Sequence, residues 1–360
     1  MLTFAIPTYN RVEKLKVCLD SICQQIQGRE NFFVTVCNNK STDSTALLLE
    51  EYCRKYSFLS YKNLDEHTVV QDEKGSWFCS VDMAKSNWIW TFGDDDLLLE
   101  NGLQKVVNTI DKHRELRFLH ATQGPRCLGT GKLYKTDSLL KLCEQFGWID
   151  TCGFISSNIV RASDLKLAYV NYANTEYNKG VFAQPSVILE QLASAPAALL
   201  DDAIVGLQDD EMTEETKRRW FEKEDHATRY FYTLDAIKEI IRRQPSIPKT
   251  LPAAFFRYHR YHLWERHLSD LVSNYDHIQT SVHPNTFEII KGYATLVTEP
   301  SIRKSILAAT INLQDTIAML EAAKSRLDIF RNINGSAIYG WKNIEMGHTC
   351  KNSVEGISVE

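Results

Sequence analysis

Three consecutive carboxylates follow a short apolar segment and are the residues best suited to chemistry in this sequence. The segment at 88–92 has the composition of a buried strand, and it is followed closely by Asp94, Asp95 and Asp96. Adjacent like charges repel, so we expect a divalent cation or several hydrogen-bond donors to neutralise them. Hard oxygen ligands of this kind suit Mg²⁺ or Mn²⁺. The alternative is an acidic turn that caps the next helix, because Asp is common in turns and caps.

Two polar loops are predicted to lie near these carboxylates, because each follows a strand of the same sheet. Residues 7–11 (PTYNR) follow an apolar strand at 2–6, and residues 38–45 (NNKSTDST) follow a second strand at 32–37. Ligands of doubly wound folds bind at the carboxyl edge of such a sheet. Both loops mix donors and acceptors, and the first adds an aromatic ring, as a nucleotide base and ribose require. Alone, either loop could be an ordinary connection with helix caps.

Strands and helices alternate through the first half of the chain. Asn10 is predicted to cap the first helix, with Glu13 three residues later, and Gly28 to end it. This βαβα order predicts an α/β fold with a mostly parallel sheet and helices on both faces. The other predicted helices cover 42–56, 71–84, 100–113 and 185–192, and the other predicted strands cover 58–61, 116–121, 154–160 and 197–207.

The C-terminal part has helical periodicity and no convincing strand. We therefore predict a catalytic domain at 1–210, an α-helical C-terminal extension at 211–335 and an irregular tail at 336–360. The charged segment 208–220 could be a lid over a bound donor, although its acids followed by bases also suit an ordinary helix start. The aromatic and basic helix at 255–267 could contact a lipid headgroup, or could simply bury its aromatic face.

Composition narrows the class of protein. Forty-six acidic and 41 basic residues leave a net charge of -5, which does not indicate binding of nucleic acid by bulk electrostatics. No segment approaches the roughly 18 uncharged apolar residues that a membrane span needs. The nine cysteines are an odd number without a C-x-x-C pair, unlike a disulfide framework, and the first residues do not resemble a signal peptide. We expect a folded cytoplasmic protein, which could act peripherally on the inner face of the membrane.

Taken together, these residues resemble the family-2 glycosyltransferases of GT-A fold. Residues 6–11 resemble the start of that family, 38–45 resemble its D-N-x-S-x-D-x-T loop, and 93–96 resemble its DxD element. The resemblance covers about residues 1–210. The segments 88–96 and 154–160 resemble more narrowly the abequosyltransferase-like branch of bacterial O-antigen and capsule sugar transferases.

The resemblance implies roles for individual residues. Asp96, with Asp94, is the implied ligand of Mn²⁺ or Mg²⁺, and Asn38 is implied to contact the edge of the base. The family usually has Asp at that position, and the amide slightly favours cytosine, although uracil and guanine stay open. The nucleotide-sugar donor is implied to contact side chains of all three loops, namely Pro7, Thr8, Tyr9, Arg11, Asn38, Asp94 and Asp95.

The family's catalytic base is missing from its usual place. An acidic residue is commonly found at the start of the helix before the last core strand, and here residues 182–186 (FAQPS) contain none. Glu176, in the preceding loop, is our candidate for the base, although an exposed loop Glu is most often only a solvated side chain. The base could also come from elsewhere, or the enzyme could be impaired.

The resemblance predicts a metal-dependent enzyme that moves a sugar from a nucleoside diphosphate donor to a glycan acceptor. The expected setting is bacterial surface polysaccharide synthesis, with an acceptor that could be lipid-linked and a helical part that could form homo-oligomers. One alternative is a nucleotidyltransferase, which would need a glycine-rich phosphate loop near its start, and no glycine precedes Gly28. The other is a non-catalytic module that binds nucleotide or a partner.

Overall fold

The computed structural model describes residues 1–68, 75–123, 129–146, 149–173, 183–208, 240 and 357–359. The predicted helical extension lies outside these residues except for Ile240, so its boundaries stay predictions. Within the predicted tail, residues 357–359 form a short strand, β10 (Ile357–Val359), rather than irregular chain.

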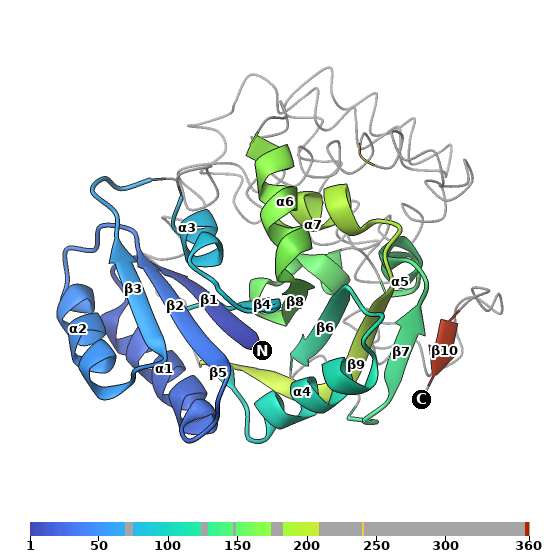
Figure 1. The fold of residues 1–360 in the computed structure, drawn as a ribbon, viewed down its shortest axis with the longest axis horizontal. Coiled ribbons are helices and arrows are strands. Elements are labelled where there is room, and N and C mark those ends of the chain that lie inside the picture. The colour runs from blue at the N-terminus through green and yellow to red at the C-terminus, as the bar shows by residue number, and fades with distance from the viewer. Residues whose placement is uncertain are drawn as a thin grey trace, which may run out of the picture. The chain divides into compact units, whose positions relative to one another are not determined.

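The first half of the structure alternates strands and helices as predicted (Figure 1). Strand β1 lies between β2 and β4 and is parallel to both, and β3 continues the parallel order beyond β2. Every residue of β1 is buried, because helices cover both faces of this part of the sheet. The elements are β1 (Leu2–Thr8), α1 (Val12–Ile26), β2 (Phe32–Asn38), α2 (Thr45–Lys55), β3 (Leu59–Asn63), α3 (Ser76–Asp82) and β4 (Trp88–Thr91).

The second half completes one mixed sheet. Strand β8 lies between β4 and β6 and is antiparallel to both, whereas β6 and β9 are parallel. The elements are β5 (Asp96–Leu98), α4 (Gly102–Lys112), β6 (Phe118–Gln123), β7 (Leu133–Thr136), α5 (Leu139–Phe146), a π-helical turn η2 (Ile149–Gly153), a 3₁₀ turn η3 (Ile155–Ser157), β8 (Asn158–Arg161), α6 (Ala162–Ala173), α7 (Ala183–Leu192) and β9 (Ala197–Leu207).

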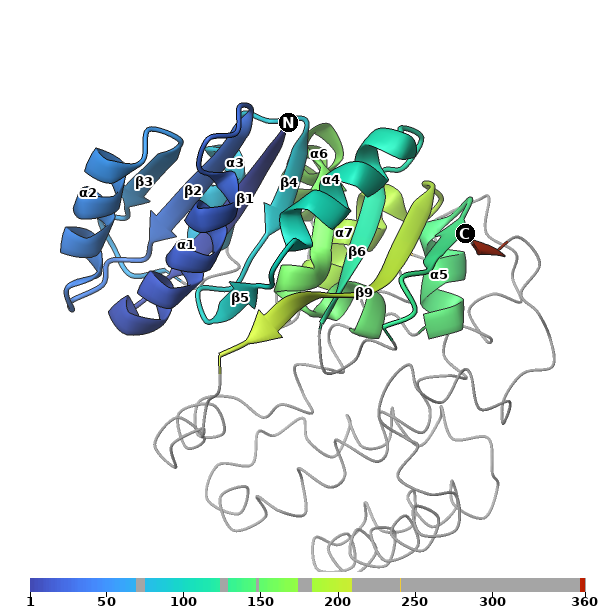
Figure 2. The same cartoon turned by 90° about the horizontal axis from the view of Figure 1, so that it is seen from below.

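The strand order is β10-β7-β9-β6-β8-β4-β1-β2-β3, and β5 pairs with β9 outside this path. Helices α1, α2 and α4 lie along one face of the sheet, and α3, α6 and α7 lie along the other (Figures 1 and 2). The predicted α/β class with helices on both faces is confirmed. The sheet is more mixed than the mostly parallel sheet predicted. Parallel pairings join β1 to β2 and β4, β2 to β3, and β6 to β9, whereas β5, β7, β8 and β10 pair antiparallel.

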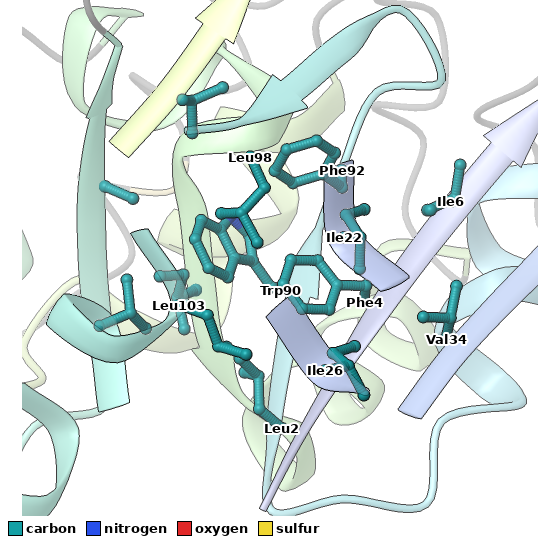
Figure 3. Packing of buried hydrophobic residues seen from close by; sticks show 14 of the residues in the cluster. Leu2, Phe4, Ile6, Ile22, Ile26, Val34, Trp90, Phe92, Leu98 and Leu103 are labelled. Carbon is teal, nitrogen blue, oxygen red and sulfur yellow. The ribbon is translucent and has the colours of Figure 1, made fainter. Parts of the chain in front are cut away.

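An aromatic cluster forms the centre of the core on the α1 face (Figure 3). The rings of Phe4 and Trp90 stack with centroids 4.9 Å apart, and Phe92 packs edge-on against both at 5.7 Å. Ile22 and Ile26 of α1 close the cluster. Because β4 supplies Trp90 four residues before Asp94, this packing holds the end of β4 in place.

Two local predictions are wrong. Asn10 does not cap α1: it adopts a left-handed backbone (φ 51°), and the backbone N–H of Val12 donates instead to Asp43 Oδ2 at 3.1 Å. The acidic segment is not only a turn, since Asp96 begins strand β5 and pairs with Leu207 of β9. The sequence predictions also lack β7, α5 and α6: β7 and α5 are short, and the apolar residues of α6 do not gather on one side of the helix.

The described residues contain no helix that is both long enough and apolar enough to cross a membrane. Their seven cysteines are all free thiols, and five of the seven line the core around α1, β2 and α5 or η2, where a thiol packs as a small hydrophobic group.

Replacing Trp90 with Ala should lower the free energy of unfolding by about 3–5 kcal/mol, because the cluster cannot close over a cavity of that size. Urea denaturation followed by circular dichroism would measure the loss. Leu47→Ala is the control, since Leu47 is 66% exposed, and its effect should stay within about 0.5 kcal/mol. Equal effects of the two substitutions would contradict the central position of Trp90.

Candidate active site at the carboxyl edge of β1 and β4

The three loops predicted to hold the chemistry meet at the carboxyl edge of the sheet. The chain leaves β1 towards β2 on one side, and the crossover through α3 returns it to β4 on the other side. The gap between β1 and β4 is therefore a topological switch point, the place where open α/β sheets bind ligands. At this edge, Thr8 of β1 lies beside Asn38 of β2. On the other side of β1, the N–H of Phe92, just after β4, donates to Ala5 O at 3.0 Å.

Asp94 is held from two sides by the loop after β1. Thr8 Oγ1 donates to Asp94 Oδ2 at 2.7 Å, and Arg11 NH1 donates to Asp94 Oδ1 at 2.9 Å. The carboxylate is buried, and burial raises its pKa above the usual value, although the Arg11 charge opposes that shift. Both of its oxygens are thus engaged by protein groups.

Asp95 shares the same guanidinium. Arg11 NH1 lies 2.9 Å from Asp95 Oδ2, so one nitrogen bridges the two carboxylates. The Arg11 and Asp95 side chains are 36% and 38% exposed, whereas that of Asp94 is 7% exposed. The bridge is therefore the part of the cluster that faces solvent.

Asp96 is held by a different segment of the chain. Ser156 Oγ donates to Asp96 Oδ2 and accepts from the backbone N–H of Gly93 at 2.7 Å. Burial raises the pKa of Asp96 to about 7, and the neighbouring charges of Asp95 and Asp94 add to the shift. A positive charge brought to this carboxylate would favour its ionised form.

The turn that carries Ser156 is fixed to β4. Trp90 Nε1 donates to Ser156 O at 2.7 Å, and Thr91 Oγ1 donates to Ile155 O at 2.8 Å. The core tryptophan therefore positions the serine that binds Asp96. In the sequence, Ser156 lies within the segment 154–160 that resembles the sugar transferases, but no local pattern indicates a role for it.

Gly93 allows two of the carboxylates to approach the backbone closely. A Cβ on this glycine would lie 2.7 Å from Asp96 Oδ2 and 3.0 Å from Asp95 Oδ1, so a larger residue would displace one of them. Oxygens of two different carboxylates thus lie close together, and they are the type of ligand that a hard divalent cation prefers. Within the described residues, no three His, Cys, Asp or Glu side chains form a complete metal-binding group.

The loops after β1 and β2 are joined by hydrogen bonds between residues about 31 positions apart. The N–H of Asn10 donates to Ser41 Oγ at 2.9 Å, and Asn10 Oδ1 accepts from the N–H of Thr42 at 2.7 Å. Asp43 caps two helices at once: Oδ2 accepts from Val12 at the start of α1, and Oδ1 accepts from the N–H of Thr45 at the start of α2 at 3.0 Å. These contacts fix the backbone on both sides of Arg11.

Asn38, predicted to contact a base, makes two intramolecular hydrogen bonds. Its Nδ2 donates to Asn63 Oδ1 at 2.9 Å, and its Oδ1 accepts from the N–H of Ser41 at 3.0 Å. One amide hydrogen and one lone pair remain for a ligand, but the residue is only 2% exposed. Its contacts organise the loop after β2.

A ring pair that the sequence analysis missed lies beside these loops. The rings of Tyr9 and His67 are 4.2 Å apart, and Tyr9 is exposed. His67 Nδ1 lies 3.3 Å from Asn39 O, and Asn39 also binds Thr68 through three hydrogen bonds. No local pattern indicates His67, because only the loop contacts made by Asn39 bring it to Tyr9.

The structure thus brings Thr8 into contact with Asp94, and Arg11 into contact with Asp94 and Asp95, while Ser156 holds Asp96 beside them and Tyr9 lies between Thr8 and Arg11. Pro7 is buried within β1 beside Cys37 and contributes to the strand rather than to the exposed surface. The candidate base Glu176 lies outside the described residues. Gln184, in the first turn of α7, occupies the place where the resemblance expects a carboxylate.

Comparison with known proteins agrees with this geometry. Residues 3–124 match the model of glycosyl transferase family 2. Abequosyltransferase RfbV of Salmonella typhimurium is 28% identical over 117 residues, which is 32% of this chain and 34% of that protein. The poly(ribitol-phosphate) beta-glucosyltransferase of Bacillus spizizenii is 28% identical over 108 residues, which is 30% of this chain and 17% of that protein. The match thus spans about a third or less of these relatives.

Solved structures with low sequence identity share the fold. A fragment of S. aureus TarS in complex with UDP-GlcNAc has a TM-score of 0.59 and 17% identity over 91% of both chains. The mannosyltransferase PcManGT from Pyrobaculum calidifontis, in complex with GDP-Man and Mn²⁺, has a TM-score of 0.51 and 12% identity over 90% of this chain and 86% of that chain. Residues 3–124 are therefore similar to a glycosyl transferase family 2 domain, and the predicted resemblance and GT-A fold are confirmed.

Ser156→Ala should destabilise the site, because it leaves the N–H of Gly93 and the carboxylate of Asp96 without their shared partner. We expect the free energy of unfolding to fall by about 1–3 kcal/mol, measured by urea denaturation. Ser157→Ala is a matched control: this neighbouring serine is also buried, and its hydroxyl has no hydrogen-bond partner within the described residues. A larger loss for Ser157→Ala than for Ser156→Ala would contradict the assignment.

Asp43→Ala should lower the free energy of unfolding by about 1–2 kcal/mol at pH 7, because two helices lose a cap. Burial opposes ionisation of Asp43, but hydrogen bonds from Thr45 and Val12 hold its pKa below 3.8. The stabilisation is therefore complete above about pH 4 and is lost as the pH falls through the lowered pKa. The free energies of unfolding of the wild type and of Asp43→Ala should therefore differ at pH 7 and become similar near pH 3, as urea denaturation at the two pH values would measure. A difference between the two proteins that grows at low pH would contradict the role of Asp43.

Proposed function

We propose that this protein transfers a sugar from a nucleoside diphosphate donor to a glycan acceptor, with Mn²⁺ or Mg²⁺ bound. The observation that carries the proposal is the convergence of Thr8, Arg11 and the three aspartates at the switch point of a family 2 domain. A nucleotidyltransferase is disfavoured, because the loop after β1 places one arginine and one threonine there rather than a glycine-rich phosphate cradle.

The donor would lie across the loops after β1, β2 and β4. The exposed ring of Tyr9, with His67 beside it, offers a stacking surface for the base, and Arg11 offers a cation for the diphosphate. A diphosphate donor agrees with the ligands named for the structural neighbours, UDP-GlcNAc for TarS and GDP-Man for PcManGT. Neither neighbour identifies the base for this chain, because their named nucleotides differ.

Asp96 is the proposed principal metal ligand. Its Oδ2 accepts from Ser156, and Asp96 Oδ2 and Asp95 Oδ1 both lie close to the Gly93 backbone. Asp95 is better suited to the second position than the predicted Asp94, because both oxygens of Asp94 are engaged by Thr8 and Arg11. A bound divalent cation would stabilise the negative charge that develops on the diphosphate as the glycosidic bond breaks.

The acceptor is proposed to be a bacterial surface glycan, which could be lipid-linked. The names of the relatives support this class, since one is an abequosyltransferase and another a poly(ribitol-phosphate) glucosyltransferase. The acceptor hydroxyl needs a general base, and Glu176 remains our proposal for it.

A non-catalytic nucleotide-binding module is the second candidate. Gln184 favours it, because an amide at the start of α7 cannot accept a proton as the expected carboxylate would. Release of nucleoside diphosphate from any sugar nucleotide by the purified protein would exclude this alternative. Binding of nucleotide without any turnover, in the presence of candidate acceptors, would support it.

Melting curves with UDP, CDP, GDP and dTDP, each with and without Mn²⁺, would test the donor site. A nucleotide at 100 times its dissociation constant should stabilise the protein by about 2.7 kcal/mol. We expect one nucleotide to dominate and its effect to depend on the metal. Absence of a shift with all four would contradict the proposed function.

Asp96→Asn should abolish the metal-dependent part of that stabilisation, because the amide removes the negative charge while keeping the shape of the side chain. Asp137→Asn is the control, since Asp137 is exposed, lies just before α5 and forms an ion pair with Lys141 four positions later. Retention of the full metal-dependent shift in Asp96→Asn would remove the role assigned to Asp96.

A further inference from the structure

The three carboxylates at the end of β4 have partners of two kinds. Thr8, at the end of β1, and Ser156, in the turn η3, are buried hydroxyls that hold Asp94 and Asp96 from the interior of the domain. Arg11, which holds Asp94 and Asp95, is instead 36% exposed on its side chain. The guanidinium is therefore the one of these three partners that reaches the cluster from the solvent side.

The contacts of Arg11 with Asp94 and Asp95 have a geometry that would allow another cation to replace the guanidinium. Both contacts of Arg11 with the carboxylates use the same nitrogen, NH1, at 2.9 Å. A two-nitrogen fork on a single carboxylate is the stronger arrangement, and the Arg11–Asp95 pair is exposed on both sides, where an ion pair adds little stability. Meanwhile the backbone on both sides of Arg11 is fixed, because the N–H of Val12 donates to Asp43 and the N–H of Asn10 donates to Ser41, so the Arg11 side chain can move without the loop.

We propose that Arg11 is an exchangeable counter-cation, which neutralises Asp94 and Asp95 while the donor site is empty and moves to the donor's diphosphate when donor and divalent cation bind. This inference rests on the proposed function and adds a mechanism of coupling to it. A divalent cation beside Asp95 and Asp96 supplies the positive charge that Arg11 otherwise provides. The diphosphate accepts the released guanidinium, since planar guanidinium groups match phosphate oxygens.

Two consequences follow for binding. Mn²⁺ alone has to displace Arg11 from Asp95, so its affinity for the free protein is reduced. The donor diphosphate withdraws Arg11 from the carboxylates and so raises the affinity for Mn²⁺, and by linkage Mn²⁺ raises the affinity for the diphosphate equally. Arg11 thus makes the two ligands bind cooperatively.

Arg11→Met tests the inference, because it removes the charge while keeping an unbranched side chain. We would measure binding of Mn²⁺ alone by electron paramagnetic resonance, and binding of UDP with and without Mn²⁺ by calorimetry, using the preferred diphosphate if the melting curves identify another. We expect Mn²⁺ alone to bind Arg11→Met about tenfold tighter and the metal-free diphosphate to bind about tenfold weaker.

Arg29→Met is the matched control, because it removes the same charge at a position away from the aspartates. Arg29 lies just after α1 and donates to Gln104 of α4. It should bind both ligands as the wild type does. Arg11→Gln serves as a second variant if Arg11→Met does not melt cooperatively, and the same results are expected for it.

The outcomes separate this inference from the proposed function. If the wild type and Arg11→Met bind Mn²⁺ alone with equal affinity, or if the variant binds it more weakly, the counter-cation role is overturned while the donor site stands. If neither protein binds Mn²⁺ or any nucleoside diphosphate, the proposed function fails and the inference fails with it.

Discussion

Mutual repulsion between Asp94, Asp95 and Asp96 is the constraint on which the rest of this site depends. Two of the three carboxylates are buried, where a charged group is expensive unless donors or cations compensate it. The protein compensates them separately: Thr8 and Arg11 serve Asp94, Arg11 also serves Asp95, and Ser156 serves Asp96. Each partner comes from a different place in the chain than β4, so the cluster can exist only in the completed fold.

A hydrogen bond from the hydrophobic core helps to position the three aspartates. Trp90 packs between Phe4 and Phe92 and at the same time donates its indole hydrogen to Ser156 O. Ser156 in turn binds Gly93 and Asp96 through one hydroxyl. Packing of the aromatic cluster thereby helps to position a carboxylate, and the absence of a Cβ on Gly93 lets Asp95 and Asp96 lie close to the backbone.

The loops after β1 and β2 show the same principle with hydrogen bonds. Asp43 caps both α1 and α2, and Asn10 accepts from Thr42 across the gap between the strands. These bonds orient the backbone around Arg11, whose side chain then bridges Asp94 and Asp95. A rigid backbone with an exposed, exchangeable side chain is what a site needs if one cation is to give way to another.

The sequence by itself determined the elements and the class. Apolar runs and helical periodicity located β1, α1, β2, β4 and β9 to within a few residues, and the three polar loops identified a glycosyltransferase-like domain. These signals are local, because the spacing of apolar residues is set by the geometry of one helix or strand. Residue type also predicted the acidic cluster, since three adjacent carboxylates need compensation wherever they lie.

The tertiary structure alone decided which partner serves each carboxylate. Arg11 and Asp94 are 83 residues apart and Ser156 and Asp96 are 60 apart, so their contacts depend on strand order and register rather than on local pattern. The role of Asn10 was mispredicted for this reason: its spacing suits a helix cap, but the neighbouring loop offers Asp43 for that cap and occupies Asn10 itself. Strand β8 likewise lies between β4 and β6 and runs antiparallel to both, after the turn η3. No periodicity in residues 154–160 indicates this position or direction.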